Sequence, residues 1–250
     1  MNVQDDVFLG GGGGPSAFSL FKTADGDPTR QLGVGPMGRI AFLDIVPLTL
    51  QADNIAAAAA PSSGVAMTLA AGTGVTQGIA PDGSGRSVYQ FDVPRAVSLT
   101  SGGDASAVNF LVSGFDFYGE PMSELIGGPN GDTVDGAKAF FSVVSVVPDD
   151  TSVQTVSVGS SDIFGLPYAI SDAGYIVSAK WNETLAQDAG TFVAADATAA
   201  TTTTGDVRGT FKPSANASNG TRRLVIGMAL TGAQCGVNSS RAAVVGVPQA

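Results

Sequence analysis

The chain has 250 residues, of which 44% are hydrophobic and only 14% are charged, and it contains 34 Gly and 13 Pro. This composition is typical of proteins built from strands and turns. The formal net charge of −10 argues against a nucleic-acid partner, because phosphate recognition needs a surplus of Lys and Arg on one face.

The first 35 residues predict an extended N-terminal arm. Five consecutive glycines, Gly10 to Gly14, make this stretch costly to order alone, and its large apolar side chains follow no regular spacing. We expect the arm to order against a partner, with four candidate contact residues: Phe8, Phe18, Leu20 and Phe21. The opening residues lack a basic segment and a long apolar segment, so we expect neither a signal peptide nor a membrane partner.

The next segment predicts one strand and one short helix. Gly33 to Gly38 matches G-x-G-x-x-G, but no strand precedes it and Pro36 interrupts it, so a turn is favoured over a nucleotide site. Residues 40–46 form a strand candidate that Pro47 ends. Residues 53–60 predict a two-turn helix, with Asp53 as its N-cap and Pro61 as its end.

From Arg95 to Tyr168 the sequence alternates apolar and small polar residues with the period of two that half-buried strands require. The strand candidates are 95–100, 107–113, 115–126, 139–147 and 153–158, and turn-forming residues separate them, as at Ser101 to Asp104. Later candidates are 175–179, 207–211 and 223–230. Residues 224–230 are apolar in both phases, which indicates a central strand covered on both faces.

The same stretch resembles a module of structural proteins of tailed bacteriophages. The matching residues are Arg95, Val97, Phe110, Val112, Gly114, Tyr118 to Glu120, Met122, Glu124, Lys138, Phe140, Val144 to Val146, and Gly159 to Tyr168. Residues 203–210 and 219–224 are similar to short sequence segments of small head-associated phage proteins. The resemblance implies a component of the virion and leaves head or tail open.

The fold class that we expect is all-β: an antiparallel β-sandwich, jelly-roll-like or Ig-like, over residues 36–250, with long loops. The low-complexity stretch from Ala194 to Gly205 is either an exposed linker or an extended edge, and it marks a possible subdivision of the domain.

The sequence contains few candidate catalytic or metal-binding residues. The chain has no His and one Cys, Cys235, which removes the usual general base, most zinc sites and an intrachain disulfide. Glu120 and Glu124 are four residues apart and could act as paired carboxylates, although solvation of a strand edge is the simpler interpretation. Asp25 to Asp27 and Asn130 to Asp135 offer oxygen ligands for calcium, but surface turns explain them better. We expect no enzyme activity and no cofactor.

Charge is distributed unevenly along the chain. Residues 101–150 contain eight acidic residues and one basic residue, whereas residues 206–223 contain four basic residues, Arg208, Lys212, Arg222 and Arg223, and one acidic residue. The two regions either face each other within one chain or dock between neighbouring copies and fix their register.

These observations favour a capsid decoration or cement protein, made in the host cytoplasm and located on the surface of the virion. The expected partners are the major capsid protein and further copies of the chain, as a homotrimer. A tail or fibre protein that adheres to the host surface is the alternative, and a carboxylate-based glycan-active enzyme is a remote one.

Overall fold

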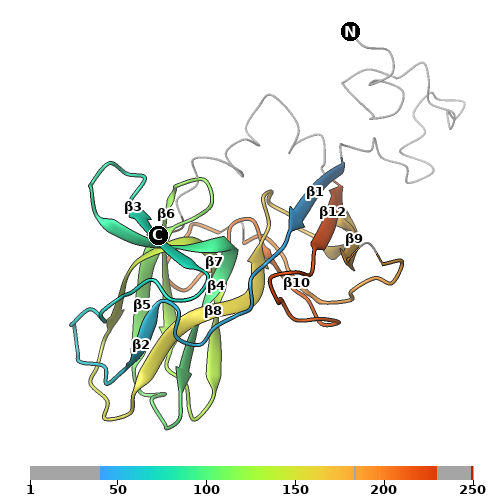
Figure 1. The fold of residues 1–250 in the computed structure, drawn as a ribbon. Helices are drawn as coiled ribbons and strands as arrows, with labels where there is room; N and C mark the ends of the chain where they lie inside the picture. Colours follow the sequence, from blue (N-terminus) through green and yellow to red (C-terminus); the bar gives the residue numbers. More distant parts are fainter. Residues whose placement is uncertain (1–39, 183, 197, 230–248, 250) are drawn as a thin grey trace, which may run out of the picture.

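The computed structural model describes residues 40–182, 184–196, 198–229 and 249. Their strands form two antiparallel sheets (Figure 1). The larger, nine-stranded sheet has the order β10-β11-β8-β4-β7-β5-β6, with β2 added to β8 and β3 added to β4. Its strands are β2 (Ala56–Ala59), β3 (Val75–Ile79), β4 (Ser87–Ser101), β5 (Asn109–Phe115), β6 (Pro121–Gly127), β7 (Thr133–Pro148), β8 (Val156–Gly165), β10 (Thr191–Val193) and β11 (Thr210–Lys212).

The larger sheet curls around a hydrophobic core, which confirms the predicted all-β, antiparallel, sandwich-like class. The two longest strands, β4 and β7, pair with each other and connect the two sides of the curl. Alternate residues along the strands point inward, as in Val97 and Leu99 of β4 and Phe110 and Val112 of β5. The sequence pattern predicted that every second residue over 95–158 would be apolar and buried, and the strands show this alternation.

A second sheet of three strands has the order β1-β12-β9, with β1 (Ile40–Ile45), β12 (Leu224–Ala229) and β9 (Ile176–Trp181). A single 3₁₀ turn, η1 (Ala173–Tyr175), precedes β9. The prediction of a central strand is confirmed over Leu224–Ala229, since β12 pairs with β1 on one side and β9 on the other. Cover on both faces is not complete, because Val225 and Ala229 on the outer face are half-buried. The inner face of this sheet forms a separate hydrophobic cluster with Phe164 at the end of β8 and Phe211 of β11.

The predicted helix at residues 53–60 is wrong. This segment bends and then forms β2, in which Ala56 lies opposite Val158 and Ala59 lies opposite Val156 of β8. Ile55 and Ala56 are fully buried in the sandwich core. The helix propensity of a short alanine run is small, so burial against β8 decides its conformation.

The stretch from Ala194 to Gly205 is mostly a loop that is tied to the rest of the molecule. Asp196 accepts hydrogen bonds from the amides of Thr198 and Gly205, at 3.0 Å each. Further along, the carbonyl of Thr202 accepts a 2.7 Å hydrogen bond from the amide of Leu125 in β6. The loop therefore lies against the outer edge of β6.

Candidate functional site

The basic segment meets the acidic region within one chain at two points. Arg208 precedes β11, and its guanidinium forms a buried ion pair with Asp116, at the end of β5, and lies 5.1 Å from the centre of the Tyr118 ring. Lys212 donates a 2.8 Å hydrogen bond to Asp135 of β7 in a more exposed pair. For these two residues the structure gives the intrachain arrangement.

The two other basic candidates lie elsewhere. Arg223 forms a bidentate pair with Asp44 of β1, with nitrogen–oxygen distances of 2.7 and 2.6 Å, and this aspartate is outside the acidic region. The guanidinium of Arg222 donates to the carbonyl of Ala217 at 2.9 Å, within its own loop. Arg223 thus fastens β12 to β1 across the outer face of the smaller sheet.

Glu120 and Glu124 occupy different environments. Glu124 is buried on β6 and accepts hydrogen bonds from the main-chain amides of Ala137 and Lys138 in β7. Burial raises the pKa of the Glu124 carboxyl, and these two hydrogen bonds oppose the shift. Glu120 is half-buried in the turn before β6, where its amide donates to Asp116 at 2.9 Å. The contacts of Glu124 therefore fit a structural role.

The four apolar candidates of the N-terminal arm, Phe8, Phe18, Leu20 and Phe21, lie outside the described residues, as do Asp25 to Asp27. Asn130 to Asp132 form the turn before β7, in which Asp132 accepts a 2.9 Å hydrogen bond from the amide of Asn130, whereas Thr133 to Asp135 belong to β7. Among the described residues, no group of three or more His, Cys, Asp or Glu is placed to hold a metal ion.

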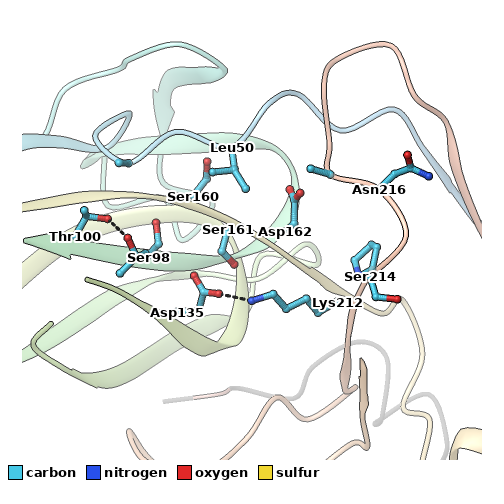
Figure 2. Close-up of a pocket in the computed structure, with 14 residues that line it drawn as sticks. Leu50, Ser98, Thr100, Asp135, Ser160, Ser161, Asp162, Lys212, Ser214 and Asn216 are labelled. Carbon is cyan, nitrogen blue, oxygen red and sulfur yellow. Dashed lines mark hydrogen bonds and ion pairs between the residues drawn. The ribbon is translucent and has the colours of Figure 1, made fainter. Parts of the chain in front are cut away.

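A cavity of about 430 Å³ lies where β4 and β8 meet the loop after β11 (Figure 2). Hydroxyl groups line much of it, with the Asp135–Lys212 pair on one side and Asp162 on another. Asp162 is already satisfied, since it accepts hydrogen bonds from the amide and the hydroxyl of Ser218 at 2.9 and 2.5 Å. Such a lining suits water or a small polar molecule, and its aspartates are engaged in structural contacts.

The outer face of the smaller sheet carries an exposed apolar patch, which we define as Ile40, Phe42 and Val177. Their side chains are 47%, 64% and 48% exposed. Phe42 lies opposite Gly227 of β12, where a Cβ atom would be only 3.2 Å from the Phe42 ring. Because Gly227 has no side chain, the ring can lie across the sheet. A large exposed aromatic ring on a sheet face is a candidate contact for another protein.

Sequence reasoning did not single out this patch. Residues 40–46 were predicted as a strand, and the apolar residues in both of its phases were a signal that each face would meet apolar surroundings. The inner phase, Ala41, Leu43 and Ile45, packs on the second hydrophobic cluster. The outer phase, which includes Ile40 and Phe42, has no cover within the part of the chain that the structure describes.

Comparison with protein-family models, with curated proteins and with solved structures finds no match. In the described ranges no helix is long and apolar enough to span a bilayer.

Proposed function

We propose that this chain is a non-catalytic structural protein of a tailed-bacteriophage virion, and specifically a decoration or cement protein that clamps adjacent major capsid subunits on the outside of the head. The observation that carries the proposal is the exposed patch of Ile40, Phe42 and Val177 on the outer face of the smaller sheet. Exposed aromatic and aliphatic side chains on a preformed surface bind partners without the cost of ordering a flexible segment.

The residues of the phage-like module support the proposal through their structural roles. Arg95, Lys138 and Phe140 are buried. Arg95 donates to the carbonyl of Leu48 at 3.2 and 3.3 Å and to Asp92 at 3.0 Å, and so fixes the segment that joins the two sheets. These buried residues hold the scaffold together, and the likeness to phage structural proteins rests on the sequence pattern.

A clamp of this kind acts by mass action. A protein that binds the assembled shell and not the free subunits stabilises the shell by RT ln(1 + [L]/Kd), about 2.7 kcal/mol per site at a hundredfold excess over Kd. We expect the chain to act as a homotrimer, and any homo-oligomer has more contacts with the shell than a single copy.

The proposal is tested by electron microscopy of virions of the encoding phage, labelled with an antibody raised against the purified chain. Label on the heads supports it. Label confined to tails or fibres would replace it with an adhesion role, and unlabelled virions would refute both.

Light scattering on the purified chain provides an independent check. We expect an oligomer at micromolar concentration, and a stable monomer would contradict the expected homo-oligomer.

A further inference from the structure

The outer edge of β6 is covered by residues that belong to neither sheet. β6 is the last strand in the order of the larger sheet, and strand edges expose unpaired amides and carbonyls. Gln249 pairs there with Met122 in a parallel bridge. Its amide donates to the carbonyl of Pro121 at 2.7 Å, and its carbonyl accepts from the amide of Ser123 at 3.1 Å. Two residues further along β6, Thr202 pairs with Leu125.

A buried lysine holds these segments in place. Lys138 of β7 is 0% exposed, and its ammonium donates to the carbonyls of Ser123, Thr201 and Gln249 at 3.0, 2.8 and 2.6 Å. All three donors of the ammonium are used, and one of the three acceptors is the penultimate residue of the chain. Without Gln249 the buried ammonium would keep a donor unsatisfied, which is costly.

The side chain of Gln249 is also recognised. Its Oε1 atom accepts a 3.2 Å hydrogen bond from the amide of Val207, and the residue is fully buried. The site formed by β6, Lys138 and the loop before β11, which we call the β6 slot, therefore contacts Gln249 through its main chain and its side-chain oxygen. The Nε2 atom of Gln249 is buried without a partner among the described residues. Main-chain pairing of this kind is how sheet edges bind extended peptides.

The occupant of the β6 slot arrives on a long connection. Ala229, the last residue of β12, belongs to the smaller sheet, and 230–248 separate it from Gln249. A connection of this length can extend over about 60 Å at roughly 3.3 Å per residue, so the carboxyl-terminal tail can reach a slot on its own or on an adjacent copy.

We propose that the β6 slot is a peptide-binding site for the carboxyl-terminal tail, and that in the assembled protein it holds the tail of a second copy. The contacts of Gln249 are the same whichever copy supplies it, and exchange of an identical element is a low-cost route to oligomers. An empty slot would leave one donor of the Lys138 ammonium without an acceptor, and this cost favours the binding of a tail by each copy. This inference rests on the proposed function, since a clamp on a shell needs copies that hold one another.

The first experiment uses the full chain with the substitution Gln249→Pro, which removes the donating amide and the side-chain acceptor of its own tail. A fluorescent peptide of residues 241–250 should bind this variant saturably, and about tenfold or more tighter than it binds the wild-type chain, whose tethered tail competes. The matched control is the same peptide with Pro in place of Gln249, which should not bind. Failure of the wild-type peptide to bind the variant, or equal binding of the control peptide, would overturn the proposal.

The second experiment tests exchange between copies in the wild-type chain. Excess peptide 241–250 should dissociate the oligomer in size-exclusion chromatography with light scattering, and the control peptide should not. An oligomer that resists the peptide would contradict exchange of tails as the contact that holds the copies together.

Hydrogen exchange of the Ser123 amide in the wild-type chain keeps the proposal testable if Gln249→Pro does not fold. The opening free energy for hydrogen exchange should be lower at this amide than at the amide of Val112 in β5. Exchange of the Ser123 amide only through global unfolding would contradict an exchangeable tail. These measurements involve no capsid, so their failure and a failure of the chain to label heads are separate results.

Discussion

Arg208 and Asp116 form an ion pair whose side chains are only 4% and 0% exposed, and it joins the segment before β11 to the end of β5. Asp116 also accepts hydrogen bonds from the amides of Tyr118 and Glu120 at 2.8 and 2.9 Å. The pair thus fixes the β5–β6 turn against the part of the chain that leads to the smaller sheet. Arg208 was a candidate for contacts between copies, and the structure gives it this contact within the chain.

Replacing Arg208 by Met should destabilise the protein by about 3–5 kcal/mol, because the substitution leaves the buried Asp116 carboxylate without its counter-charge. Lys212→Met is the matched control, since it breaks a half-exposed pair with Asp135 and should cost at most about 1 kcal/mol. Urea denaturation of both variants measures the difference. Equal losses would mean that the Arg208 pair contributes no more than a surface pair.

Asp188 predicts a pH dependence of stability. Its buried carboxylate accepts hydrogen bonds from the Trp181 indole, the amides of Gly190, Ser214 and Ala215, and the Ser214 hydroxyl. Burial raises the pKa of Asp188, but these hydrogen bonds outweigh that effect and the pKa is lowered overall. Because the pKa of Asp188 is lower in the folded chain than in the unfolded chain, where it is about 3.9, the Asp188 carboxylate stabilises the fold at any pH above that unfolded-state pKa. This stabilisation is lost as the pH falls through the folded-state pKa.

Asp188→Asn should therefore reduce the free energy of unfolding by about 2–4 kcal/mol at pH 7, and the gap to the wild type should narrow below about pH 4. The control is Asp172→Asn, at an exposed cap whose carboxylate accepts one hydrogen bond from the amide of Gly174. Thermal or urea unfolding between pH 3 and pH 7 measures the gap. A gap that is constant across this range would contradict the role of the Asp188 charge.

Gly114 of β5 should not tolerate a side chain. A Cβ atom at this position would lie 2.0 Å from the carbonyl oxygen of Ser142 in β7, next to the point where the register of the two strands shifts. Gly114→Ala should cost about 3 kcal/mol, since the backbone of β7 would have to move. Gly102→Ala, where a Cβ atom meets nothing within 4 Å, is the control and should be close to neutral by chemical denaturation. Comparable stability of the two variants would show that the backbone of β7 can move away from residue 114 at little energetic cost.

Most strands from Arg95 onward could be predicted because their alternation reflects local burial, but β10 (Thr191–Val193) was not among the strand candidates. The strand candidate at 115–126 was wrong over Asp116 to Glu120, which form a turn between β5 and β6. The amides of Tyr118 and Glu120 donate to the Asp116 carboxylate there, a local signal for a turn that the apolar alternation on either side masked. The alanine run at 56–59 was misread because its partner, β8, is about a hundred residues away in sequence. Local propensity does not contain that information.

The smaller sheet shows the same limit. β1 and β12 were each predicted as strands, but nothing in the sequence pairs Ile40 with Ala229 or places Phe42 over Gly227. Lys138 and Gln249 meet through hydrogen bonds to main-chain carbonyls, which leave no residue pattern in the sequence. The exposed patch and the β6 slot are therefore properties of the folded chain.

The central claim is that the chain binds phage heads through the patch of Ile40, Phe42 and Val177. The most direct measurement is co-sedimentation of the purified chain with heads that lack it, comparing Phe42→Glu with Val153→Glu. Both residues are exposed, at 64% and 90%, and Val153 lies in the loop between β7 and β8, away from the patch. We predict that Phe42→Glu weakens head binding by about tenfold or more with little change in the thermal stability of the free chain, while Val153→Glu binds like the wild type. Equal binding by the Phe42→Glu and wild-type chains would contradict the account.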